Sequence, residues 1–249
     1  MKLKTLAVVA LFALISIASN CGESIDMIEK ISIDKYAYIA TVPFEPPYMY
    51  QKGGELVGPD AMLGKAIVDR IQEMQPEGST PIRLNWVNRT YSSLVDALKH
   101  GEVNLVVGVF VPTEERKQEI AFSNPYNELD LALVFNPINK IMEPANIPGA
   151  RIGVREGTGI ESYARQKFPQ AQIVPLKTVD DAVLALRRGE VHGIIADRLM
   201  AAYALCTVPG TGEMEIHPDS LGTLPVAAGL PKGDEKFLKL VNEVIADMK

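Results

Sequence analysis

The chain has 249 residues, of which 47% are hydrophobic and 22% are charged, and its formal net charge is −6 at pH 7. This length suits one large domain or two modest lobes, and the negative charge argues against general nucleic-acid binding. Only three His and two Cys are present, and no Cys-x-x-Cys or His-Glu-x-x-His pattern occurs. Composition therefore indicates an ordinary globular protein that needs neither a metal ion nor a cofactor.

The first part of the chain, residues 1–20, has the features of a secretory signal peptide. Lys2 and Lys4 precede an apolar run from 6 to 17, which is short for a membrane span but suits a leader. The following Ala18-Ser19-Asn20-Cys21 resembles a bacterial lipobox, in which the Cys is lipidated. Ordinary cleavage after Ala18, which leaves Cys21 unmodified, is the alternative. We expect a bacterial protein in the periplasm or on the outer face of the cytoplasmic membrane, lipid-anchored through Cys21.

Strand and helix patterns alternate in the first half of the mature chain. In order, we expect a strand at 34–41, a turn at Gly53-Gly54, a helix at 60–74, a strand at 82–87, a helix at 92–100 and a strand at 105–109. Strands that alternate with helices in this way favour a parallel sheet covered by helices.

A strand at 131–135 is expected to cross to a second lobe of the same kind. There we expect strands at 150–154, 173–175 and 193–196, helices at 157–167, 179–188 and 199–205, a return strand at 224–229 and a closing helix at 235–249. The predicted first lobe comprises 21–134 and 222–249, and the predicted second lobe comprises 135–221.

One phrase occurs twice, at residues 97–108 and 185–196. Each copy is typical of a helix end, a Gly stop and a buried strand. A charged residue follows each strand, Arg116 after the first copy and Asp197 after the second. Open α/β sheets bind ligands beyond the carboxyl ends of their strands. The repeat therefore indicates two similar lobes and a cleft that holds a small dipolar molecule.

Arg116 and Asp197 each have a second interpretation. A guanidinium matches a carboxylate bidentately, but Arg116 could equally be a surface helix charge paired with Glu115 or Glu119. A carboxylate at Asp197 could accept an ammonium group, or it could cap the helix at 199–205.

Five further residues are candidates for the cleft. Thr158 and Gly159 open a helix, whose first amides favour an anion or simply accept a cap. Tyr91 could stack on a ligand or pack in the core. Phe44 and Tyr48 lie among prolines after the first strand, where an aromatic residue suits a cleft wall.

A series of short motifs runs through the chain in a characteristic order. These are Pro46-Pro47-Tyr48, residues 54–60, residues 93–103, residues 113–117, residues 122–126, Gly153-Val154 with Gly157-Thr158, residues 186–191 and Ala196-Asp197. Over about residues 25–248 the series resembles the bacterial extracellular solute-binding proteins of family 3, the amino-acid receptors of ABC transporters. The resemblance implies a two-lobed α/β fold of the type 2 periplasmic binding proteins (Venus-flytrap), with mainly parallel sheets and two hinge crossings.

The resemblance also implies roles. Arg116 would grip the α-carboxylate of a small amino-acid-like ligand, Asp197 would take its ammonium group, and Tyr91 would stack on its side chain. Two positions that often carry a hydroxyl or a Gly in the family are Val111 and Val109 here, and the frequent second hydroxyl after Thr158 is replaced by Gly159. We expect a monomer that delivers its ligand to an ABC transporter permease, without catalysis.

Two alternatives stay open at this point. The first is a periplasmic enzyme similar to the cyclohexadienyl or arogenate dehydratases, which would need a general acid such as Glu161 or Glu45. The second is a ligand-sensing receptor module that signals through a separate partner.

Overall fold

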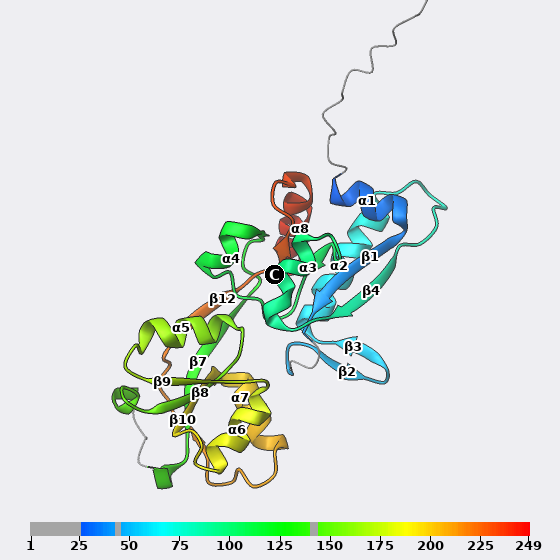
Figure 1. The fold of residues 1–249 in the computed structure, drawn as a ribbon. Coiled ribbons are helices and arrows are strands. Elements are labelled where there is room, and N and C mark those ends of the chain that lie inside the picture. Colours follow the sequence, from blue (N-terminus) through cyan, green and yellow to red (C-terminus); the bar gives the residue numbers. More distant parts are fainter. Residues whose placement is uncertain (1–25, 43–45, 140–143) are drawn as a thin grey trace, which may run out of the picture.

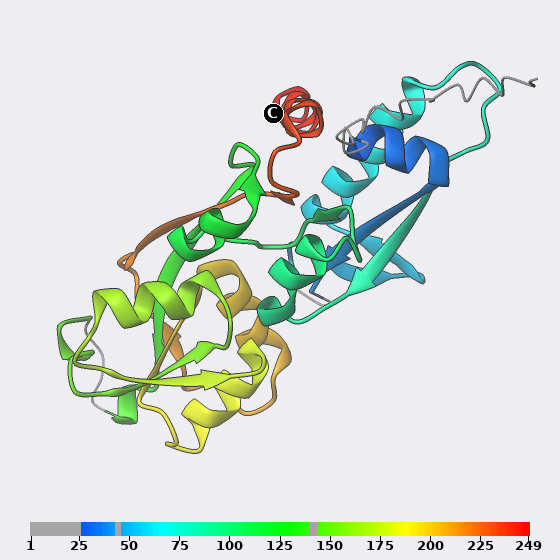
Figure 2. The ribbon, with the colours of Figure 1, turned by 45° about the horizontal axis from the view of Figure 1, so that its top comes forward.

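The computed structural model describes residues 26–42, 46–139 and 144–249. It shows two lobes linked by long crossing strands (Figures 1 and 2). Predictions for Cys21, Phe44 and Glu45 fall outside the described residues. Within the described residues, no helix is both long enough and apolar enough to cross a membrane.

The first lobe is built on a five-stranded mixed sheet with the order β4-β1-β5-β13-β6. Its strands are β1 (Tyr36–Thr41), β4 (Arg83–Asn88), β5 (Leu105–Val106), β6 (Ala121–Phe122) and β13 (Gly229–Leu230). The pairs of β1 with β4 and β5 are parallel, whereas β13 is antiparallel to β5 and β6. A hairpin of β2 (Tyr50–Lys52) and β3 (Glu55–Val57) lies beside this sheet, with the expected turn at Gly53-Gly54.

Helices cover both faces of this sheet because alternate side chains of β1 point to opposite sides. Ala37 and Ile39 join the core under α1, α2 and α8, whereas Ala40 joins the core under α3. The helices are α1 (Met27–Asp34), α2 (Pro59–Glu73), α3 (Leu94–Lys99), α4 (Glu114–Glu119) and α8 (Glu235–Asp247), and a 3-10 turn at Tyr91–Ser93 precedes α3.

The second lobe has a mixed sheet with the order β11-β7-β10-β8-β9, to which β12 adds by pairing with β7. The strands are β7 (Asn127–Phe135), β8 (Arg151–Arg155), β9 (Gln172–Leu176), β10 (Gly193–Asp197), β11 (Glu215–Ile216) and β12 (Gly222–Val226). The core of one face lies under α5 (Gly159–Lys167), and that of the other face lies under α6 (Val179–Arg187) and α7 (Arg198–Thr207). Each helix begins at a side-chain cap, Thr158, Thr178 and Asp197 respectively.

The two lobes are joined by β7 and β12. These strands pair antiparallel from Asn127↔Val226 to Leu131↔Gly222, and both run between the lobes in Figure 2. The predicted lobe boundary at 221/222 lies next to the second-lobe end of this pair, and that at 134/135 lies further along β7, where it pairs with β10 and β11. Both boundaries stay a prediction.

The repeated phrase folds the same way in both lobes, as α3-β5 and as α6-β10. Gly101 and Gly189 have left-handed φ values of 68° and 71°, a conformation that favours Gly. In each copy, the residue after this Gly donates the hydrogen bond that ends the helix. The amide of Glu102 donates to the carbonyl of Ala97, and the amide of Glu190 donates to that of Ala185, both at 2.9 Å.

The two-lobed α/β fold is confirmed, with some differences in detail. Both sheets are mixed, because the crossing and return strands add antiparallel pairs to the parallel ones. The expected return strand is divided into β12 and β13, and the strand expected at 105–109 ends at Val106. Helices α1 and α4 were not anticipated.

Phe237→Ala should lower the free energy of unfolding of the first lobe by about 3–5 kcal/mol, because it leaves a large cavity. Phe237 in α8 is 1% exposed in the core under the sheet. Urea denaturation followed by fluorescence of Trp86 in β4, the only tryptophan, measures the change. Lys239→Ala, at an exposed position of the same helix, is the control, and equal losses in the two variants would contradict the prediction.

Candidate functional site

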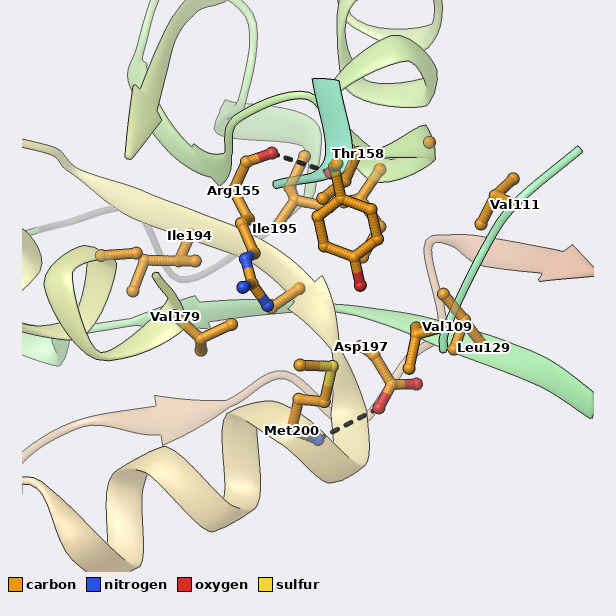
Figure 3. A pocket seen from close by; sticks show the side chains of 15 residues that line it. Val109, Val111, Leu129, Arg155, Thr158, Val179, Ile194, Ile195, Asp197 and Met200 are labelled. Atoms are coloured by element: carbon orange, nitrogen blue, oxygen red, sulfur yellow. Dashed lines mark hydrogen bonds between the residues drawn. The ribbon is translucent and has the colours of Figure 1, made fainter. Parts of the chain in front are cut away.

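Residues from both lobes line a narrow cavity where the chain leaves β5 and where β10 ends (Figure 3). The cavity has a volume of about 20 Å³, which holds about one water molecule. Six of the predicted site residues line it: Tyr91, Val109, Val111, Thr158, Gly159 and Asp197. Most of the other lining residues are apolar, so the site is a poorly hydrated seam between the lobes.

Asp197 ends β10 and caps α7. Its Oδ1 accepts hydrogen bonds from the amides of Leu199 at 3.1 Å and Met200 at 3.0 Å (Figure 3). The amide of Asp130 in β7 donates to Oδ2 at 3.2 Å. The residue is 1% exposed, and burial raises its pKa while these donors lower it. Asp197 is therefore both a helix cap and an acid at the cleft, so the two interpretations of the sequence are compatible.

Tyr48 reaches Asp197 from the other lobe. Its hydroxyl donates to Oδ1 of Asp197 at 3.1 Å, and its backbone carbonyl accepts from the amide of Asp60 in α2 at 3.2 Å. Burial, and then the charge of Asp197, raise the pKa of Tyr48 well above its usual value. The hydroxyl therefore keeps its proton and acts as a donor that links the lobes.

Arg116 also links the lobes, and here the charged group belongs to the first lobe. Its Nη1 donates to the carbonyl of Val111 at 2.8 Å, and its Nη2 donates to the carbonyl of Gly157 in the second lobe at 2.7 Å. The guanidinium also lies over the ring of Phe110, 4.3 Å from its centroid. Burial lowers the pKa of Arg116 to about 10, so the side chain stays charged at pH 7.

Arg116 does not line the narrow cavity. It lies in the wall of an adjoining hollow of about 360 Å³, which Tyr91 and Thr158 also line. Because these two residues line both spaces, the hollow and the cavity are neighbouring parts of one interlobe seam. The surface alternative for Arg116, pairing with Glu115 or Glu119, does not hold, because its guanidinium is bound to backbone carbonyls and it is 9% exposed.

Thr158 caps α5 as part of a reciprocal arrangement. Its Oγ1 accepts from the amide of Glu161 at 3.2 Å and donates to the carbonyl of Arg155 at 2.7 Å. Glu161 Oε2 accepts from the amide of Gly157 at 2.7 Å. The amides of the first helical turn have no acceptor within the helix and carry partial positive charge. This helix start therefore favours an anion.

Glu161, the acid that a dehydratase would use, is fully engaged in this cap. One oxygen holds the amide of Gly157, and the other pairs with Arg165 at 2.7 Å. It is placed as a structural carboxylate rather than as a proton donor to a ligand.

Two departures from the family pattern, Val111 and Gly159, contact each other across the seam. A Cβ atom added at Gly159 would lie 2.4 Å from the Cβ of Val111. The two residues therefore share one space between the lobes. The valine occupies the space that a larger residue at 159 would need.

Val109 has an uncommon backbone conformation, with φ of 46°, which is strained for a β-branched residue. Its amide donates to Oδ2 of Asp60 at 3.0 Å. Asp60 is 0% exposed, and the buried hydroxyl of Tyr126 lies close enough to interact with its carboxylate. Burial raises the pKa of Asp60 to about 6. Asp60 thus holds the strained residue in the cleft wall.

Sequence reasoning missed several residues of this seam. The side chain of Arg155, at the end of β8, lines the cavity, and its Cζ lies 5.0 Å from the ring centroid of Tyr91. Asp60 was assigned only to the start of a helix and to the 54–60 motif, and Met200 and Leu129 were not singled out. The end of a strand in the second lobe was the one signal that could have pointed to Arg155.

Residues 38–249 match the bacterial extracellular solute-binding proteins, family 3. The chain belongs to this family. The ABC transporter arginine-binding protein 1 of Escherichia coli K12 is 25% identical over 250 residues, which cover 99% of this chain and 94% of that protein. The histidine-binding periplasmic protein of Salmonella typhimurium LT2 is 26% identical over 221 residues, which cover 85% of this chain and 81% of that protein.

A solved structure of holo ArgBP from T. maritima has the same fold, with a TM-score of 0.76 at 22% identity, over 88% of this chain and 92% of that one. Family membership makes this chain an extracellular solute-binding protein, and the two relatives above are named as binding proteins.

Gly159→Ala should hold the lobes apart, because its new methyl group collides with Val111. Overpacking of this kind costs about 1–3 kcal/mol, which lowers the population of the form in which the lobes are in contact about tenfold. We expect a larger radius of gyration by small-angle X-ray scattering. Adding Val111→Gly should reverse the change, and Gly212→Ala, where nothing lies within 4 Å, should have no effect. Failure of the second change to restore the radius would contradict a direct contact.

Asp60 should make stability depend on pH. Its pKa is about 6 in the fold and 3.8 when exposed, so the unfolded chain holds fewer protons between these values. Stability therefore falls as pH rises from 4 to 6. The free energy of unfolding of the wild type, relative to that of Asp60→Asn, should be up to about 3 kcal/mol larger at pH 4 than at pH 7. Urea denaturation across this range measures the difference, and parallel profiles for the two proteins would rule it out.

Proposed function

We propose that the cleft binds an α-amino acid whose carboxylate meets Arg116 and whose ammonium group meets Asp197. One observation carries the proposal. Two buried, opposite charges lie along one seam, one from each lobe, and each is hydrogen-bonded to the other lobe. A molecule with both charges can replace both links at once and hold the lobes closed.

The carboxylate end has a donor set ready for it. Arg116 presents two guanidinium nitrogens that now donate to carbonyl oxygens. A carboxylate is a stronger acceptor than a carbonyl and binds guanidinium bidentately. The first amides of α5 lie beside this point and favour the same anion.

The ammonium end would displace a neutral donor. Asp197 accepts four hydrogen bonds, three from backbone amides and one from the Tyr48 hydroxyl. An ammonium group brings charge to the same carboxylate, so its hydrogen bonds are the stronger ones. The three amides keep the carboxylate in place while the tyrosine is exchanged.

The narrow cavity is too small for an amino acid, so the lobes must separate to admit one. The ligand then shifts the population toward a closed form, as far as its affinities for the two forms differ. The closed form, a monomer, would deliver the amino acid to the permease. The names of the arginine-binding and histidine-binding relatives support an amino acid as the ligand class.

The membrane anchor is a separate proposal. The apolar run at 6–17 and the Ala18-Ser19-Asn20-Cys21 segment support lipidation of Cys21 in a periplasmic or outer-face location. Membrane fractions from cells that express the wild type and Cys21→Ser test it. Equal amounts of both proteins in the soluble fraction would exclude the anchor.

A thermal-shift screen with the twenty amino acids tests the function directly. A ligand that binds only the folded chain stabilises it by RT ln(1 + [L]/Kd), about 2.7 kcal/mol at a hundred times Kd. We expect at least one amino acid to raise the unfolding midpoint, and no shift with any of them would overturn the proposal.

Arg116→Ala should weaken binding of the amino acid found in that screen by about tenfold to a hundredfold, since a charge-assisted hydrogen bond contributes about 1.5–3 kcal/mol. Isothermal titration calorimetry measures the loss. Lys117→Ala, at the next residue, removes an exposed charge that pairs with Glu114 and should bind normally. Unchanged affinity in Arg116→Ala would remove Arg116 from the site.

A further inference from the structure

We propose that Asp60 is a positioning residue that couples the cleft to the hinge, the point where the crossing strands β7 and β12 leave the first lobe. Its buried carboxylate interacts with Val109 in the cleft wall and with Tyr126 at the hinge. This inference rests on the proposed function, because it concerns the affinity of the cleft. Asp60 does not line the narrow cavity, so its effect on a ligand has to pass through the residues that it holds.

The first contact of Asp60 is with the cleft wall. Its Oδ2 accepts the amide of Val109 at 3.0 Å, and Val109 lines the cavity with a φ of 46°. A β-branched residue keeps such a conformation only where its surroundings impose it. The amide of Asp60 also donates to the carbonyl of Tyr48 at 3.2 Å, and the hydroxyl of Tyr48 reaches Asp197. Asp60 therefore supports two residues of the cleft.

The second contact of Asp60 is with the hinge. The hydroxyl of Tyr126 is buried beside the carboxylate and interacts with it. Tyr126 immediately precedes β7, and its amide donates to the carbonyl of Val226, the last residue of β12, at 3.0 Å. Tyr126 also packs against the core under α1, α2 and α8 in the first lobe and against the core under α5 in the second. A rotation of one lobe against the other therefore acts directly on Tyr126.

The electrostatic state of Asp60 depends on both contacts. Burial raises the pKa of its carboxyl group to about 6, whereas the Tyr126 hydroxyl and the Val109 amide lower that pKa. At pH 7.5 the group is ionised, and hydrogen bonds to an ionised acceptor are stronger than those between neutral groups. The charge is therefore stabilised by one donor from the hinge and one from the cleft.

Burial makes these two contacts dependent on each other. Asp60 is 0% exposed, so water does not readily replace a donor that moves away, and loss of a donor to a buried charge is costly. Bending of the chain at Tyr126 would shift the carboxylate and, with it, the amide of Val109. A ligand that packs against Val109 would favour one position of Tyr126 in return, because coupling between two sites is reciprocal.

Tyr126→Phe tests the coupling, because it removes the hydroxyl and keeps the ring. It should weaken binding of the amino acid found in the thermal-shift screen by about threefold to thirtyfold at pH 7.5, although Tyr126 does not line the narrow cavity. Isothermal titration calorimetry measures the loss. A lower free energy of unfolding with an unchanged Kd would show that the hydroxyl serves only the fold, and it would overturn the proposal.

The matched control is Tyr163→Phe. It removes the hydroxyl of a half-buried tyrosine that donates to the carbonyl of Leu221. Tyr163 lies in α5 of the second lobe, away from Asp60, so this variant should bind the amino acid normally. Equal losses of affinity in Tyr163→Phe and Tyr126→Phe would contradict a specific role for the hinge hydroxyl.

A double-mutant cycle tests whether Tyr126 acts through Asp60. Asp60→Ala removes the carboxylate, so Tyr126→Phe should have no further effect on affinity in that background. Asp60→Asn keeps an oxygen for the amide of Val109 and should restore part of the affinity. If Asp60→Ala does not fold, the effect of Tyr126→Phe should be smaller in Asp60→Asn than in the wild type. Additive losses would overturn a route through the carboxylate.

Hydrogen exchange of the Val109 amide provides a measurement that needs no ligand. Exchange followed by NMR should be at least about threefold faster in Tyr126→Phe than in the wild type, because the acceptor of this amide is held less firmly. An unchanged rate overturns the coupling. Faster exchange in a protein that binds no amino acid rejects the proposed function and leaves the link between Tyr126 and Val109 in place.

Discussion

Burial of a charge is costly unless polar partners replace the water that it loses, and this constraint explains the seam between the lobes. Arg116 and Asp197 are almost completely enclosed, and neither finds all of its partners in its own lobe. Each lobe completes the hydrogen bonding of the other. The closed arrangement is thus stabilised by the same groups that, in the proposed function, would bind the two charges of a zwitterion.

Much of the fold could be predicted because its signals are local. The two helix-Gly-strand units show the same glycine conformation and the same terminal bond, and both follow from short stretches of sequence. Helices α1 and α4, with eight and six residues, gave no such signal. Isolated helices of that length are marginal, so their stability comes from tertiary packing.

The site was predictable only in part for a related reason. Strand ends indicated Arg116 and Asp197, because ligands meet parallel sheets there. The partners of these residues come from distant segments: Gly157 is 41 residues from Arg116, and Tyr48 is 149 residues from Asp197. The match of Val111 with Gly159 is also invisible in sequence, where each looked like a separate loss of a hydroxyl. In the structure, Val111 and Gly159 share one space between the lobes.

The pairing of β7 with β12 has a mechanical consequence. Because their ladder continues into the sheet of the second lobe, the two strands move with that lobe and resist sliding past each other. We therefore expect bending at the ends of the pair nearer the first lobe. There the amide of Tyr126 donates to the carbonyl of Val226, and the amide of Ala227 donates to the carbonyl of Phe110. A pivot there would turn small torsions of a few residues into a wide swing at the far rim, and opening would then require little rearrangement of either hydrophobic core.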